Sequence, residues 1–438
     1  MTLFPNLIFL GLLLFGIGFF TRNILRIRRN ILIGKEMYRS DNKSQRWAYM
    51  TRVALGQSKM GTKPVAAFLH LIVYVGFVLI NIELLEIVLD GLLGSHRLFA
   101  PILGKFYDFL IGCFEILAFL VLIAVIIFWI RRNITRIKRF WKPEMKGWPK
   151  MDADFILYFE VILMLLFLSM NASDSILQDR GIENYINAGS FPISQFLYPL
   201  FDGLSDEVLI VFERSFWWAH IIGILVFLNY LYYSKHLHIL LAFPNTFYAN
   251  LDPEGGFEVD PHIKNEVILM MYPEKLISDN EVSPPDKFGA NDIFDLKWTQ
   301  LMNAYSCTEC GRCSEVCPAN LTGKKLSPRK IMMDTRDRLE EVGKNIDANK
   351  GVFKDDNKKL LNNYISAEEL WACTTCNACV DACPIAIDPV SIIMDMRQYL
   401  VMEQSAAPQE LNAMMSNIEN NGAPWPFSNK DRLQWVSE

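Results

Sequence analysis

The sequence has 438 residues, of which 51% are apolar and 21% charged, and its net charge is −5. The first 240 residues contain long apolar runs, whereas the rest reads as an ordinary soluble protein. A chain of this length can carry two or three domains. The slightly acidic balance argues against nucleic acid as a partner.

Five apolar segments are long enough to cross a bilayer, which takes about 20 helical residues. They lie near 3–20, 65–89, 106–130, 154–170 and 208–232. The first has no basic residue ahead of it and no small-residue cleavage site, and a basic cluster follows it directly. We therefore expect an uncleaved anchor rather than a signal peptide.

The charges of the connecting loops predict the orientation. Residues 22–63 hold eleven Lys or Arg against two acids, and 131–150 hold eight against one, whereas 172–207 is acidic. Basic loops face the cytoplasm. We expect a multi-pass protein of the bacterial cytoplasmic membrane, in contact with membrane lipid, with its N-terminus outside and the part after the fifth segment in the cytoplasm.

Two cysteine runs carry the clearest chemical signal. The first run is CTECGRCSEVCP and the second run is CTTCNACVDACP, both C-x2-C-x2-C-x3-C-P. The first consists of Cys307, Cys310, Cys313 and Cys317; the second consists of Cys373, Cys376, Cys379 and Cys383. This spacing is typical of bacterial ferredoxins that hold [4Fe–4S] clusters, in which the fourth Cys of each run serves the other cluster.

We therefore predict two clusters with crossed ligands. Cys383 completes the cluster of Cys307, Cys310 and Cys313, and Cys317 completes the cluster of Cys373, Cys376 and Cys379. The alternative is a pair of structural zinc sites, although zinc sites usually pair two C-x2-C units without the further Cys and Pro. Because eight of the nine cysteines lie in the runs, little is left for disulfides, which indicates a reducing compartment.

Histidines near the membrane segments predict a haem. His70 begins the second segment and His238 follows the fifth, so both lie at the cytoplasmic edge, at matching depth, as a bis-histidine haem b requires. We expect the fifth helix to continue through His238, which places His220 on the same face and His236 about 160° away. The alternative is that these histidines only form hydrogen bonds at the membrane edge.

Other polar residues in the apolar segments raise two further questions. A second haem at His220 would need a partner that the second segment does not offer, unless His96 folds back. Glu83 and Glu86 are carboxylates in an apolar run, where charge is costly, and we expect them to serve quinone and proton chemistry or to cap the helix.

The remaining chain predicts a linker and a helical cluster domain. Residues 241–291 contain Pro244 and the Ser-Pro-Pro sequence at 283–285, which indicate a linker after the membrane half (1–240). Helices are expected near 292–305, 327–342, 367–371 and 388–404. The wide spacing between the runs favours an α-helical two-cluster ferredoxin domain over 292–404. A polar tail, 405–438, follows, and its Trp residues would either dock a partner or pack back on the domain.

Several of these sequences resemble a known family. WWAH at 217–220 and SKHLH at 234–238 are similar to the last helix of the cytochrome b subunit of respiratory nitrate reductase, and closer to membrane-bound heterodisulfide-reductase-like proteins. The sequences at 295–313 and 326–330 resemble the ferredoxin part of those proteins. The resemblance implies a mainly α protein, in which a five-helix cytochrome b domain is fused to a helical ferredoxin domain.

The sequence departs from that pattern in two respects. The nitrate reductase subunit has two histidines ten residues apart on its second helix, whereas this chain has only His70 there. Many relatives continue into cysteine-rich CCG modules that bind a catalytic cluster. None is present in this sequence, so we expect the substrate-transforming site on another polypeptide.

We therefore expect an electron-transfer subunit, the quinone-reactive part of an oxidoreductase complex. It would connect the quinone pool, through haem b and two [4Fe–4S] clusters, to a CCG-type reductase subunit or an electron-transfer flavoprotein system. The rival hypothesis is a membrane-anchored redox-sensing or assembly protein whose clusters do not turn over.

Overall fold

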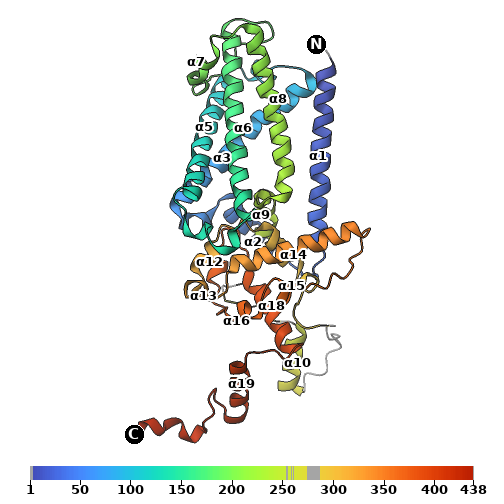
Figure 1. Cartoon of the computed structure of the whole chain (residues 1–438), viewed down its shortest axis with the longest axis vertical. Helices are drawn as coiled ribbons and strands as arrows, with labels where there is room; N and C mark the ends of the chain where they lie inside the picture. The colour runs from blue at the N-terminus through green and yellow to red at the C-terminus, as the bar shows by residue number, and fades with distance from the viewer. Residues whose placement is uncertain (1–2, 253–254, 258, 260, 274–286, 438) are drawn as a thin grey trace.

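The computed structural model describes residues 3–252, 255–257, 259, 261–273 and 287–437. Figure 1 shows an elongated molecule with long helices side by side at one end and shorter helices at the other. The described residues form helices and no strand, apart from isolated bridges such as Lys35 with Lys297. The prediction of a mainly α fold with five membrane helices is confirmed.

Five helices are long and apolar enough to cross a membrane, and each overlaps one predicted segment. They are α1 (Leu3–Ile31), α3 (Pro64–Leu93), α5 (Lys105–Asn133), α6 (Trp148–Asp179) and α8 (Asp206–Tyr230). α1 continues through its basic cluster because Arg is a good helix former and because Ile27 and Ile31 are buried against the C-terminal half.

The membrane helices pack through small and aromatic side chains. Ala118 and Ala124 of α5 are fully buried, which lets neighbouring helices approach closely. Phe9 of α1 meets Trp217 of α8 with ring centroids 5.4 Å apart. Short helices α4 (Ala100–Leu103) and α7 (Tyr198–Phe201) lie in the loops at the end remote from the cysteine runs.

The fifth membrane helix does not continue through His238, and that prediction is wrong. α8 ends at Tyr230, a 3₁₀ turn spans Leu231–Tyr233, and Ser234 is extended with φ −114° and ψ 149°. The argument that His220 and His238 share one helix face therefore fails. Their relation is set by tertiary packing instead.

Side chains take over the amide hydrogen bonds where the helix breaks. The Lys235 amide donates to the Asp152 carboxylate at 3.0 Å, and the His236 amide donates to the Ser234 hydroxyl at 3.1 Å. A buried carboxylate from α6 thus competes successfully with the helical acceptor, because charge-assisted hydrogen bonds are the stronger kind.

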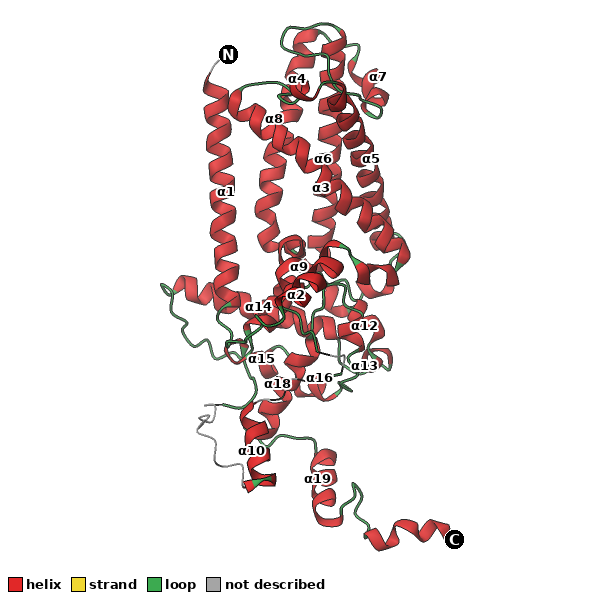
Figure 2. Cartoon of the chain, turned by 180° about the vertical axis from the view of Figure 1, so that it is seen from behind, coloured by secondary structure: helices red, strands yellow, loops and turns green. Residues whose placement is uncertain are grey.

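The predicted linker begins as a helix. α9 (His238–Phe247) passes through Pro244, which we expected to end the helical pattern. It packs against α2 (Lys43–Met50), and both lie between the membrane helices and the C-terminal helices (Figure 2). α10 (Pro261–Met271) follows. The Ser-Pro-Pro sequence at 283–285 lies outside the described residues.

The C-terminal half consists of short helices around the two cysteine runs. They are α11 (Trp298–Ser306), α12 (Arg312–Val316), α13 (Pro318–Leu321), α14 (Pro328–Ala348), α15 (Leu360–Asn363), α16 (Ala367–Trp371), α17 (Ala378–Asp381) and α18 (Pro389–Met402). All four expected helices are present, although the first starts with a 3₁₀ turn over Ile293–Asp295 and α14 extends beyond 342.

The two halves share one hydrophobic core. Ile27 and Ile31 of α1 and Leu237 belong to the same buried cluster as Leu301 of α11 and Leu339 of α14. Apolar burial of this kind is worth roughly 25 cal/mol per Å². The helices α11 and α14 of the C-terminal half therefore pack directly against α1.

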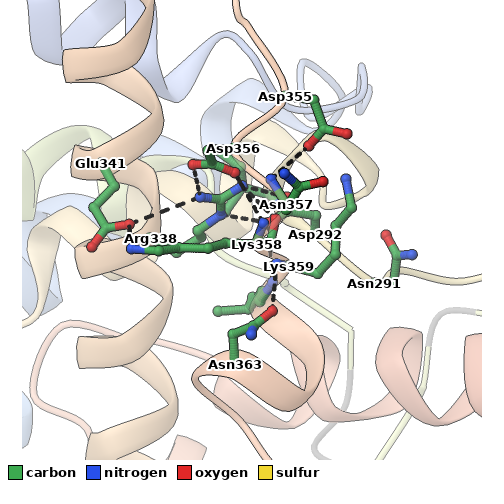
Figure 3. Close-up of polar contacts among 12 residues, drawn as sticks. Asn291, Asp292, Arg338, Glu341, Asp355, Asp356, Asn357, Lys358, Lys359 and Asn363 are labelled. Atoms are coloured by element: carbon green, nitrogen blue, oxygen red, sulfur yellow. Dashed lines mark hydrogen bonds and ion pairs between the residues drawn. The ribbon is translucent and has the colours of Figure 1, made fainter.

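A buried arginine holds the long insertion between the runs. Arg338 of α14 is fully buried and donates to both oxygens of Asp292, at 3.0 and 2.9 Å, and to Asp356 at 2.6 Å (Figure 3). Although burial lowers it, these carboxylates raise the pKa of Arg338 above its ordinary value. The network fastens α14 to the segments before α11 and α15.

The tail extends away from the rest of the molecule. α19 (Gln409–Asn421) and a 3₁₀ helix over Asn429–Val436 form its described part (Figure 1). Trp435 is 74% exposed. Partner docking by this tail stays a prediction.

Candidate iron–sulfur and histidine sites

The two cysteine runs adopt the same backbone twice. Each forms a loop, then a short helix, α12 or α17, and then its fourth Cys and Pro. Glu309 and Thr375 occupy equivalent positions, both with φ 55°. Gly311 and Asn377 are equivalent too, with φ 73° and 58°. Left-handed residues turn the loop tightly, which lets successive thiols face one centre.

The fold brings the fourth cysteine of each run beside the other run. Cys307, Cys310 and Cys313 line one cavity together with Cys383, and Cys379 also reaches its wall. Cys317 is buried in the hydrophobic cluster against which Cys373 of the second run packs. Burial is the main cause that raises the pKa of Cys373 and Cys379.

Three of the eight thiols, those of Cys307, Cys317 and Cys379, are buried, and Cys376 is exposed. Burial raises the pKa of Cys307 to about 12, so a free thiol there keeps its proton and iron binding would displace it. The Thr375 amide lies 3.4 Å from the Cys373 sulfur, and the Ile387 amide lies 3.3 Å from the Cys383 sulfur. Amide hydrogen bonds to sulfur tune cluster potentials.

His70 and His238 meet at the join between the two halves. Their ring centroids are 6.4 Å apart. Imidazole nitrogens bind first-row metals at about 2 Å, so an iron between two rings needs centroids about 6 Å apart. The His70 Nδ1 faces Gln57 Oε1 at 3.2 Å, and the His238 Nδ1 faces the Lys235 carbonyl at 3.1 Å. Metal-binding histidines usually donate their other N–H in this way.

The residues therefore fit a bis-histidine haem. Burial lowers the pKa of His238, which favours the neutral imidazole that binds metal. His236 differs from this pattern. Its ring stacks on His238 at 5.5 Å, but its Nδ1 is buried without a hydrogen-bond partner, and its Nε2 lies 3.9 Å from Glu160.

His220 lies deeper, beside an apolar cavity of about 150 Å³. Its Nδ1 faces the Leu163 carbonyl at 3.1 Å. The Nδ1 atoms of His70 and His238 likewise face an oxygen acceptor. The cavity is also lined by Asn81, Glu83 and Glu160. His96 is engaged elsewhere, 3.1 Å from the Asp174 carboxylate.

The two candidate quinone carboxylates differ in their surroundings. Glu83 is 4% exposed and its Oε2 has no hydrogen-bond partner, although it lies at the wall of the apolar cavity. Glu86 accepts hydrogen bonds from the Phe99 amide at 2.7 Å and the Tyr107 hydroxyl at 2.8 Å. Glu83 is thus available to a ligand, whereas Glu86 fixes the following loop.

Sequence reasoning missed the residues that join the sites. Gln57 supports His70, Lys235 forms an ion pair with Glu309, and Arg312 contacts the loop after α2. Although burial raises it, the Lys235 and Arg336 charges hold the pKa of Glu309 below its ordinary value. In the sequence, the lysine of SKHLH and the acid of CTEC could have indicated this ion pair, because neither side chain is a proposed metal ligand.

The region of the two cysteine runs matches a known protein family. Residues 306–387 match the family of 4Fe-4S dicluster domains. These residues are a 4Fe-4S dicluster domain. The match supports iron–sulfur clusters over the zinc alternative. No solved structure matches the chain.

Relatives extend beyond the dicluster domain. A probable iron-sulfur-binding oxidoreductase, FadF, from Bacillus subtilis is 29% identical over 87% of this chain and 54% of its own length. The EtfAB:quinone oxidoreductase of Syntrophomonas wolfei is 26% identical over 93% and 56%. One polypeptide of the dihydromethanophenazine:CoB–CoM heterodisulfide reductase of Methanosarcina mazei is 28% identical over 33% and 36%.

The chain spans about half the length of the first two relatives. It is homologous to iron–sulfur oxidoreductases and, over about a third of its length, to heterodisulfide reductase subunits. The expected resemblance to heterodisulfide-reductase-like iron–sulfur proteins is confirmed, and the chain combines five helices that could cross a membrane with a 4Fe-4S dicluster domain.

Proposed function

We propose that this chain transfers electrons between membrane quinone and a cytoplasmic redox partner through haem b and two [4Fe–4S] clusters. One observation carries the proposal: the dicluster domain shares a core with the membrane helices, and His70 and His238 face each other at that join. The candidate haem site and the cysteine runs therefore belong to two parts of the chain that pack against each other. Such proximity is what electron transfer requires.

The cluster ligands follow from the proposed crossed arrangement. One cluster is held by Cys307, Cys310, Cys313 and Cys383 and the other by Cys317, Cys373, Cys376 and Cys379. The lining of the first cavity and the closeness of Cys317 to the second run support this assignment. Iron and acid-labile sulfide should each approach about eight per chain.

The haem ligands are His70 and His238, and His236 is not a ligand. Bound there, haem b supplies one-electron chemistry between quinone and clusters. Gln57 and the Lys235 carbonyl orient the two imidazoles. We identify no second axial ligand for a haem at His220, so we propose one haem. His220 with Glu83 instead faces the apolar cavity, which we propose as the quinone site.

The partner is proposed from the relatives. The name of the Syntrophomonas protein states that it connects EtfAB with quinone. We propose the same class of partner here, an electron-transfer flavoprotein system, or else a CCG-type reductase module. We propose that the dicluster domain and this partner lie in the cytoplasm, a proposal that the basic loops support.

A spectroscopic experiment tests the proposal. The full chain is purified in detergent, and its reduced-minus-oxidised visible spectrum is recorded with a short-chain quinol as reductant. Haem b bands and cluster EPR signals that appear together on adding the quinol support the proposal. Clusters without quinol-responsive haem would contradict it and favour the redox-sensing or assembly protein.

A further inference from the structure

The two cysteine runs share a backbone but differ in several side chains, two of which replace a charged residue by an uncharged one. Glu309 in the first run corresponds to Thr375 in the second, and Arg312 corresponds to Ala378. The matching left-handed conformations at 309 and 375 show that a glutamate is not needed to form the loop. Glu309 and Arg312 each contact residues outside the dicluster domain.

Glu309 is buried in a triad of charges. One carboxylate oxygen forms an ion pair with Lys235, and the other accepts a hydrogen bond from Arg336 at 2.7 Å. The side chain of Glu309 is 2% exposed and that of Lys235 10%. Charges buried to this extent are costly unless paired, so loss of one partner is felt by the other. Lys235 is three residues before the proposed haem ligand His238.

Arg312 reaches the segment that supports the other proposed haem ligand. Its guanidinium donates to the Lys59 carbonyl at 3.3 Å and to the Thr62 hydroxyl at 3.2 Å. This turn directly follows Gln57, which faces the His70 ring. The first run therefore contacts the supports of both histidines.

Among the described residues, the second run has no buried ion pair like that of Glu309 with Lys235. In the described part of the chain, the ion pair from within Cys373–Cys383 to the membrane half is Asp381 with Lys59, at 3.8 Å, and the Asp381 side chain is 64% exposed. Cys376 is exposed, whereas Cys307 is buried. The two runs thus differ in their polar contacts with the membrane half, and the second run has an exposed thiol at Cys376.

We propose that the first-run cluster is the electron port to the membrane half and that the second-run cluster is the port to the soluble partner. Glu309, Lys235 and Arg312 are the positioning residues of the first port. The proposal rests on the proposed function. Each transfer moves one electron, so one centre is oxidised as the next is reduced, and no bond or proton is exchanged.

Cluster-deletion variants test the order. In the full chain, a short-chain quinol is mixed rapidly with the protein and the EPR signals are followed by freeze-quenching. Cys376→Ser, which removes the second-run cluster, should leave quinol reduction of the first-run cluster at its normal rate. Cys310→Ser, which removes the first-run cluster, should block reduction of the second. The reverse pattern overturns the proposed order.

Charge variants test the positioning residues. Glu309→Gln keeps the size of the side chain and should slow reduction of the first-run cluster at least about tenfold, as expected when partners are misplaced. It should also raise the midpoint potential of that cluster alone, because a negative charge beside it is lost. Thr375→Ala is the matched control in the second run and should leave the rate for the first-run cluster unchanged. Normal rates and potentials in Glu309→Gln would contradict the assignment.

A second pair of variants lies outside the cysteine loops. Lys235→Met should slow the same step, and Lys235→Arg, which keeps the charge, should restore most of the rate. Equal rates in both variants overturn the role of the ion pair. If the unmodified protein takes up no electrons from quinol, the proposed function itself fails; normal uptake with the wrong order defeats only this inference.

Discussion

Cys317 and Cys383 end their own cysteine runs, yet each lies beside the other run. Cys383 shares a cavity with the first three thiols of the first run. Residues that serve a site formed by two segments tie those segments together, so crossed ligands would make the two runs one cooperative unit.

The crossed assignment predicts the effect of one substitution. Cys317→Ala should remove the cluster of Cys373, Cys376 and Cys379 and leave the other largely intact, because Cys317 lies near the second-run thiols. EPR of the reduced protein measures both clusters separately. Loss of the first-run signal alone would show that each run binds its own cluster.

The histidines at the join predict a second contrast. His238→Ala should abolish the haem b spectrum while the iron–sulfur signals remain, since the thiols lie in another part of the fold. His236→Ala is the control and should retain most of the haem, because His236 faces Glu160 rather than His70. Visible spectra of the two variants distinguish these outcomes. Haem retained in the first variant, or lost only in the second, would refute the ligand assignment.

At the scale of elements, the break after α8 matters most. The α-helix is interrupted between Tyr230 and the start of α9. This interruption turns the chain at the membrane edge, so that His238 faces His70 of α3. A continuous helix would have fixed His238 by its register with His220. The turn is held by Asp152 of α6, a contact between elements that are far apart in sequence.

α14 is the element on which stability of the dicluster domain should depend. Arg338→Met leaves Asp292 buried without its partner, which costs about 3–5 kcal/mol. We expect a clear fall in the temperature at which the cluster absorbance is lost. Lys358→Met is the control, because its ion pair with Glu341 at 3.0 Å is exposed and worth about 0–1 kcal/mol. Similar losses in both variants would contradict a special role for the buried network.

For the whole molecule, the loop charges predict how the protein sits in the membrane. The basic loops and the dicluster domain should lie in the cytoplasm and the acidic 172–207 segment outside. Reporter fusions after Glu438 and within 172–206 test this prediction. A cytoplasmic signal from the second fusion would reverse or break the proposed topology.

Features that depend only on short stretches of the chain could be predicted without a structure. Apolar runs of bilayer length predicted the five membrane helices, and the C-x2-C-x2-C-x3-C-P spacing predicted the iron–sulfur domain that the family match confirms. Both signals are local. A membrane helix forms its backbone hydrogen bonds within itself, and a cysteine loop supplies most ligands of one cluster.

How these parts meet depends on the packed molecule. Tertiary contacts end α8 before His238, place Gln57 against His70, and pair Lys235 with Glu309. Each of these contacts joins residues separated along the chain, and each depends on burial, which gives a charge or a polar group its strength. A residue's burial is a property of everything packed around it, so no local pattern could have specified these contacts.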